Sequence, residues 1–131
     1  MAGKYFRVYN NKPLWMDSEA LQAKLVQCIQ DSLSHFMIQN AIFLAERLYA
    51  IAKTEYNLHV LATCFYRSGK PQKSYLLLKP SLNTPENRYL FALSCYDLGK
   101  YQEAEASLLS SPNSFENVNE KVNFTSKKSK K

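Results

Sequence analysis

The sequence predicts an all-α fold of three antiparallel helix hairpins stacked as a short α-solenoid. The first observation is an internal repeat, because residues 61–79 shifted by 30 positions match residues 91–109 at six of nineteen positions. The second is an apolar stripe with the 3.6-residue period of an amphipathic helix in each copy. The third is a glycine at one place in both copies, Gly69 and Gly99, where a helix commonly ends. Stacked units of this kind act through the surface that they offer a partner.

The first hairpin is expected to contain helices over residues 18–36 and 40–52. One apolar stripe of the leading helix consists of Leu25, Cys28, Ile29 and Leu33. Phe36 stands where the later copies have glycine, so we expect this turn to be built differently. Asn40 is a candidate cap for the helix that follows.

The second helix of this hairpin is apolar on more than one face. Such a helix is either buried between neighbouring helices or covered by another chain, and periodicity leaves both interpretations open. If a second chain covers it, the candidate interface residues are Ile42, Phe43, Leu44, Leu48 and Tyr49.

The second and third hairpins follow one plan, with helices expected over residues 56–68, 71–79, 85–98 and 101–110. Gly69 and Gly99 are expected to end the first helix of each hairpin in the left-handed conformation. Pro71 suits the first turn of a helix, where its missing N–H has no intrahelical partner. Thr84 is the expected N-cap of the helix that begins at Pro85.

The spacing inside these copies resembles the tetratricopeptide repeat, in which two helices form a unit of about 34 residues. The pair Leu61-Ala62, the aromatic Phe65 and the turn residue Gly69 fit that pattern well. The resemblance therefore implies three tetratricopeptide-like hairpins.

Three blocks carry a more specific resemblance over roughly residues 20–110. They read Asn-Ala-Ile-Phe-Leu-Ala-Glu-Arg-Leu-Tyr-Ala from position 40, Leu-Ala-Thr-Cys-Phe-Tyr-Arg-Ser-Gly-Lys from position 61, and Arg-Tyr-Leu-Phe-Ala-Leu-Ser-Cys from position 88. Together they resemble the amino-terminal segment of the subunit 3 family of the anaphase-promoting complex (cyclosome), the cell division cycle protein 27 homologues. Most of these letters are not repeat consensus, so the blocks indicate more than the fold.

This resemblance implies a non-catalytic scaffold subunit of a ubiquitin ligase that acts in cell-cycle control and mitosis. It implies a homodimer formed by amino-terminal repeats, contacts with the other tetratricopeptide subunits of the complex, and residence in the nucleus and cytoplasm. In the family, carboxy-terminal repeats bind the coactivator's Ile-Arg tail. Because the sequence ends at Lys131, we do not expect that superhelix here.

A second function remains open, that of a small adaptor that holds a peptide tail in its concave groove, outside the ligase. Aligning the two glycine turns places the candidate partner-contact residues Tyr56, Tyr66, Arg67, Tyr89 and Tyr96 on the groove side. A groove that clamps a terminal carboxylate needs several basic residues, whereas tyrosine supplies amphipathic area suited to interfaces. Tyrosines that only fill gaps between helices are the competing interpretation.

The net charge of +6 belongs to the ends of the chain. Residues 1–17, a basic arm, carry +2; residues 112–131, a lysine-rich tail expected to be disordered, carry +3; and the helical domain over 18–111 carries +1. A specific nucleic-acid site is therefore not expected. The tail residues Lys127, Lys128, Lys130 and Lys131 match a short nuclear localisation signal, although a solubilising tail explains them equally well.

No motif indicates catalysis, a cofactor, a metal or a small-molecule substrate. The three cysteines lie about one per repeat, and no Cys-x-x-Cys occurs. No apolar run has the length of a membrane span, and no signal-peptide core follows Met1. We therefore expect a binding protein whose partners are other polypeptides and not a membrane.

Overall fold

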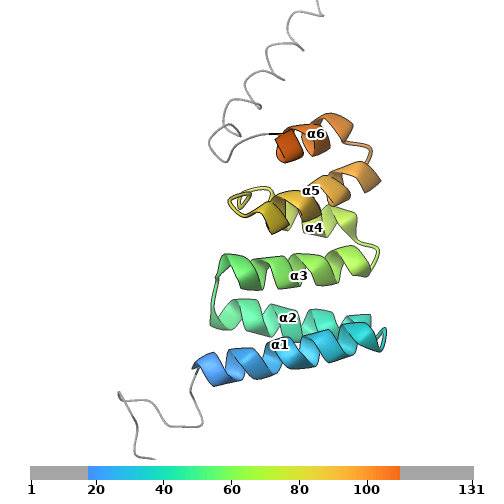
Figure 1. Ribbon diagram of the computed structural model, residues 1–131. Helices are drawn as coiled ribbons and strands as arrows, with labels where there is room; N and C mark the ends of the chain where they lie inside the picture. Colours follow the sequence, from blue (N-terminus) through green and yellow to red (C-terminus); the bar gives the residue numbers. More distant parts are fainter. Residues whose placement is uncertain (1–17, 110–131) are drawn as a thin grey trace, which may run out of the picture.

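The computed structural model describes residues 18–109, which form six α-helices without a strand among them (Figure 1). The helices are α1 (Ser18–Ser34), α2 (Ile38–Ile51), α3 (Glu55–Arg67), α4 (Pro71–Leu78), α5 (Pro85–Asp97) and α6 (Tyr101–Leu109). The predicted all-α fold is thereby confirmed, with helix ends that differ from expectation by one or two residues. The predicted arm over 1–17 and tail over 112–131 lie outside the described residues.

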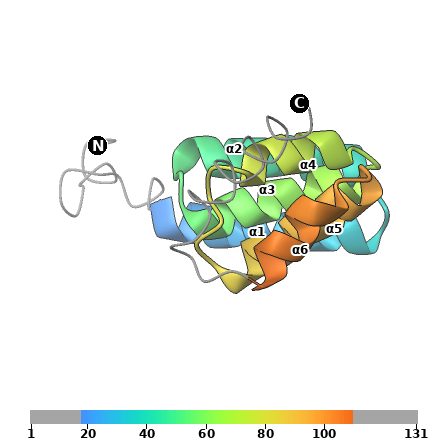
Figure 2. The same ribbon diagram turned by 90° about the horizontal axis from the view of Figure 1, so that it is seen from above.

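The helices pair in chain order as three antiparallel hairpins that stack on one another (Figures 1 and 2). Each second helix packs on the first helix of the next hairpin, α2 on α3 and α4 on α5, and α3 also contacts α5. This is the nearest-neighbour packing of a solenoid.

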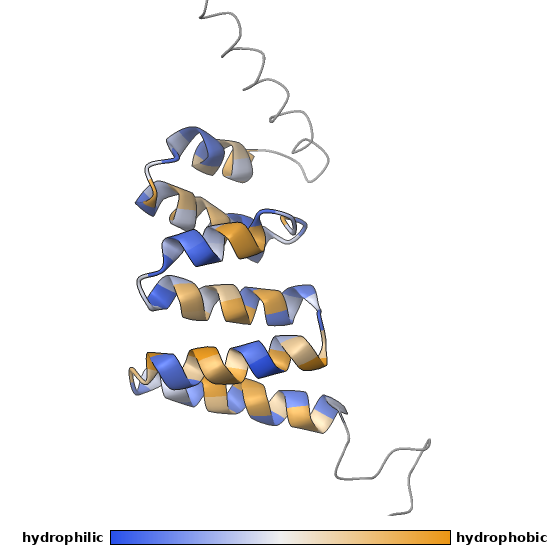
Figure 3. Cartoon of the chain, turned by 180° about the vertical axis from the view of Figure 1, so that it is seen from behind, coloured by the Kyte–Doolittle hydropathy of each residue, from blue (hydrophilic) through white to orange (hydrophobic). Residues whose placement is uncertain are grey.

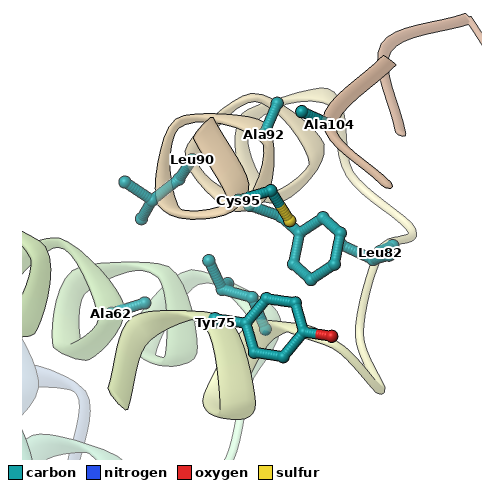
Figure 4. Close-up of a cluster of buried hydrophobic side chains, with 9 residues drawn as sticks. Ala62, Tyr75, Leu82, Leu90, Ala92, Cys95 and Ala104 are labelled. Carbon is teal, nitrogen blue, oxygen red and sulfur yellow. The ribbon is translucent and has the colours of Figure 1, made fainter. Parts of the chain in front are cut away.

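Two buried clusters hold the stack together. The first joins hairpins one and two and contains Ile29, Leu33, Ala41, Ile42, Ala45, Leu48, Leu61 and Cys64. The second joins hairpins two and three and is drawn in Figure 4. Within it the ring of Tyr75 stacks on that of Phe91, at 5.2 Å between centroids. Small residues allow α4 and α5 to approach each other closely. The hydroxyl of Ser94 on α5 donates to that of Ser74 on α4 at 3.0 Å.

The three hairpin turns have the same backbone geometry, which corrects our expectation for the first. Gly69 and Gly99 both have φ of +75°, and Phe36 has φ of +57° at the equivalent place. In each turn the next amide donates to a carbonyl five residues back, Met37 to Ser32 at 2.8 Å, Lys70 to Phe65 at 3.1 Å and Lys100 to Cys95 at 2.8 Å. This is the Schellman motif. The first turn therefore uses the left-handed conformation despite its bulky residue.

Helices α3 and α5 begin with the same N-cap arrangement, whereas the start of α2 differs from the predicted cap at Asn40. The Oγ1 atoms of Thr54 and Thr84 accept from amides three residues on, at 3.1 and 3.3 Å, which confirms Thr84 as an N-cap. Helix α2 instead begins at Ile38 after Met37, without a side-chain cap. The Asn40 amide donates to the Ser32 hydroxyl at 2.9 Å, so Asn40 joins α1 to α2 and does not cap.

Because Cys64 and Cys95 are buried, we predict that the free energy of unfolding decreases at alkaline pH. Burial raises the pKa of the Cys64 thiol from 9.0 to about 11 and that of Cys95 to about 12. Above pH 9 the unfolded chain releases these protons while the folded chain keeps them, so the free energy of unfolding falls as pH rises toward 11 and 12. Urea unfolding at pH 8 and pH 10 measures the fall.

The exposed Cys28 provides the matched control for these thiols. A thiol reagent applied to the folded protein is expected to modify Cys28 and to reach Cys64 and Cys95 only after denaturant is added. Equal reaction rates at all three positions would contradict the packing around α3 and α5.

Candidate functional site

The first candidate surface is a groove between α1 and α3. It contains a cavity of about 210 Å³ whose lining residues are Val26, Ile29, Gln30, Leu33, Tyr56, His59, Val60 and Thr63. Four of these eight side chains are aliphatic, and an amide, an imidazole and two hydroxyl groups are available for orientation. The cavity is small, so it suits one or two side chains of a polypeptide.

The predicted groove tyrosines are not equivalent to one another. Tyr56, Tyr89 and Tyr96 are 57%, 60% and 64% exposed, whereas Tyr66 is half-buried. Burial and a hydrogen bond to the Asp97 carboxylate raise the pKa of the Tyr66 hydroxyl. Tyr96 packs edge-to-face on Tyr101 of α6 at 5.5 Å between centroids. Tyr56, Tyr89 and Tyr96 therefore all offer open aromatic area, although Tyr96 is held by Tyr101, whereas Tyr66 is partly enclosed by its structural neighbours.

Two polar groups near this groove join one repeat to the next. The guanidinium of Arg67 donates to the carbonyl of Leu33 at 3.4 Å, which connects the end of α3 to the end of α1. Nδ1 of His59 lies 3.0 Å from Oδ1 of the buried Asn87 on α5. Arg67 is exposed nonetheless, so part of its guanidinium remains available to a partner.

Asn57 and Asn87 anchor the starts of α3 and α5 to the segments before them, and we did not identify them from the sequence. Both are buried, and their side-chain amides donate to backbone carbonyls before the helix, Asn57 to Ala52 at 2.9 Å and Asn87 to Ser81 at 3.2 Å. The signal was present in the sequence, because the 30-residue offset also matches Thr54 with Thr84 and Asn57 with Asn87.

The second candidate surface is the outer face of α2. Phe43 is 52% exposed, and Leu44 and Tyr49 are half-buried against the first core cluster. Ile42 and Leu48 are 7% and 0% exposed. Those two residues pack against α1 and α3, so our interface prediction is corrected for them: they fill the core and do not face a partner.

Phe43 belongs to an exposed region that continues along α2. The guanidinium of Arg47 lies 4.5 Å from the centroid of the Phe43 ring, and Ile51, one turn further, is 42% exposed. Figure 3 shows that hydrophobic residues extend along both helices of this first hairpin. The face combines apolar area with one cation, which is suited to a protein partner.

Within residues 18–109 no group of three or more His, Cys, Asp or Glu side chains is placed to hold a metal. None of the described helices is long and apolar enough to cross a membrane. The lysines of the candidate localisation signal, Lys127, Lys128, Lys130 and Lys131, lie outside the described residues.

Comparison with known proteins gives a consistent result. A family model described as "Anaphase-promoting complex, cyclosome, subunit 3" matches residues 34–111. The chain is 48% identical to the cell division cycle protein 27 homolog of Homo sapiens over 89 residues, 67% of this chain and 11% of that protein. It is 48% identical to homolog A of Arabidopsis thaliana over 85 residues, 65% of this chain and 12% of that protein.

A third relative gives the same result. The anaphase-promoting complex subunit 3 of Dictyostelium discoideum is 44% identical over 87 residues, which are 65% of this chain and 9% of that protein. The chain thus spans only about a tenth of the length of the relatives that it matches. The family-model match over residues 34–111 includes helices α2 to α6.

Proposed function

The chain belongs to the anaphase-promoting complex, cyclosome, subunit 3 family, and on that premise we propose that it is a homodimerising scaffold module of that ubiquitin ligase. Its proposed role is assembly and not catalysis, in cell-cycle control. Its proposed partners are a second copy of itself and the other tetratricopeptide subunits, in the nucleus and cytoplasm.

The observation that carries the homodimer proposal is the exposed outer face of α2. A solenoid normally covers its first hairpin with polar residues, whereas here Phe43 and Ile51 are 52% and 42% exposed. A face of this kind, repeated on two copies, is suited to a symmetric interface in which one patch meets itself. The exposed tyrosines of α3 and α5 are proposed to supply additional amphipathic area from the groove side.

The charge of the helices supports an interface that depends little on salt. The nine basic and eight acidic residues over 18–111 leave a net charge of +1, so long-range repulsion between two copies is weak. Association is therefore expected to depend on apolar contact and to persist at high ionic strength.

Co-expression of two differently tagged copies tests this role. We expect the second tag to be recovered with the first at 1 M salt, together with the tetratricopeptide subunits of the anaphase-promoting complex when the chain is expressed in cells. Recovery of the second copy without ligase subunits would contradict the assembly role, and recovery of ligase subunits without the second copy would contradict the homodimer.

The groove between α1 and α3 favours a second candidate function, that of an adaptor that binds a peptide. Its cavity of about 210 Å³ and the exposed Tyr56 are suited to an apolar side chain of an extended segment. Thr63→Trp fills this groove from α3. The variant is expected to reduce partner recovery if the groove is the contact surface, and to leave it unchanged if the α2 face is.

A further inference from the structure

A pocket opens at one end of the first hairpin, between the start of α1 and the end of α2. Its volume is about 390 Å³, and its lining residues are Leu21, Leu25, Arg47, Ala50 and Ile51. Leu21 and Ile51 are 45% and 42% exposed. Such a pocket is suited to an aromatic ring. The ring can pack on the aliphatic walls while the guanidinium of Arg47 lies over one of its faces.

We propose that this pocket binds the indole of Trp15, which belongs to the segment immediately before α1. Trp15 is the only tryptophan of the chain and is flanked by Leu14 and Met16, so three apolar residues directly precede Asp17 and Ser18. This run lies outside the described residues. The pocket and the length of the tether to Ser18 support the assignment.

The tether is short enough to hold the ring at the pocket. Trp15 lies three residues before Ser18, a distance that an extended chain covers in at most about 10 Å. Leu21 lies three residues into α1, only about 4.5 Å along the helix axis. A short tether gives an effective concentration in the millimolar range, so even a weak intrinsic affinity keeps the pocket occupied.

Arg47 favours an aromatic occupant over an aliphatic one. Its guanidinium already lies 4.5 Å from the Phe43 ring centroid, and a planar guanidinium can accept an aromatic ring on each face. Tryptophan is the aromatic side chain that attracts a cation most strongly. Trp15 and Phe43 would then enclose Arg47 between two rings.

The pocket adjoins the α2 face that we assign to the homodimer and shares Arg47 and Ile51 with it. Phe43 and Ile51 are eight residues apart on one helix, which is about 12 Å along its axis. Binding of Trp15 does not itself require a second copy, so the indole emission of the monomeric chain tests it separately from the proposed homodimer.

Fluorescence of the single tryptophan tests the proposal on the full chain. We expect the emission maximum of the folded protein to lie at shorter wavelength than that of the urea-unfolded protein, with reduced quenching by acrylamide. The double variant Leu21→Gln/Ile51→Gln should shift the emission to longer wavelength and increase the quenching. Leu76→Gln on α4, which alters an exposed leucine (60%, against 45% for Leu21) outside the pocket, should change neither.

Far-UV circular dichroism checks that the double variant folds. In addition, nuclear Overhauser effects between the Trp15 indole and the Ile51 methyl groups are expected in the unmodified protein, so the test does not depend on the variant alone. Emission equal to that of the unfolded chain would overturn the proposal. A short-wavelength emission that appears only as the chain self-associates would overturn it too, because a second copy would then cover the indole.

Discussion

Replacement of Gly69 by valine is expected to lower the free energy of unfolding by about 1–2 kcal/mol, the cost of a left-handed conformation for a residue with a Cβ. Gly69 has φ of +75° and follows the end of α3, the first helix of the second hairpin. A Cβ built at this position has no atom within 4 Å, so the loss reports backbone strain and not a clash. Urea unfolding followed by circular dichroism measures it.

Phe36 supplies the matched control at the equivalent turn. Its φ is +57° and its side chain is 82% exposed, so Phe36→Gly relieves strain while removing little packing. This substitution should leave stability unchanged or raise it, whereas Gly69→Val lowers it. Equal losses in the two variants would show that the turns are not the equivalent Schellman motifs that we describe.

Phe43→Glu is expected to convert the proposed homodimer to a monomer, with a loss of association on the order of tenfold or more, as for a buried aromatic anchor. The substitution places a charge in an apolar contact, where its desolvation is costly. The fold itself should be preserved, because the new carboxylate would stand one helical turn before Arg47 and could pair with its guanidinium. Sedimentation velocity over a concentration series measures the change.

The matched control is Leu76→Glu on α4. With the 33-residue offset that relates Ala41 to Ser74, Leu76 is the counterpart of Phe43 in the second hairpin, and it is 60% exposed. It lies outside the proposed interface, so the dimer should persist in this variant. If Leu76→Glu dissociates the dimer as strongly as Phe43→Glu, the interface lies elsewhere on the outer face of the stack.

The fold was predictable because the helix signals are local. The capping threonines determine where a helix begins, and the two turn glycines determine where a helix ends, through the backbone hydrogen bonds at that point. The repeat of 30 residues shows that the same boundaries recur. The first turn was harder to predict, since nothing in the type of Phe36 indicates a left-handed conformation. Its geometry follows instead from the packing of α1 against α2, which sets where the chain must reverse.

The candidate site was predictable only in part. Periodicity identified α2 as apolar on several faces, but it does not state which face a neighbouring helix covers. Helix α2 lies between α1 and α3, and this places Ile42 and Leu48 in the core while Phe43 remains exposed. The pocket at the end of the first hairpin was likewise invisible, because Leu21 and Ile51 line it together only when the hairpin is folded.

The mass of the chain in solution tests the central claim most directly. Multi-angle light scattering at micromolar concentration is predicted to give twice the chain mass of 15.1 kDa, at both low and high salt. A single species with the mass of one chain across the whole concentration range would contradict the account of this protein as a homodimerising module.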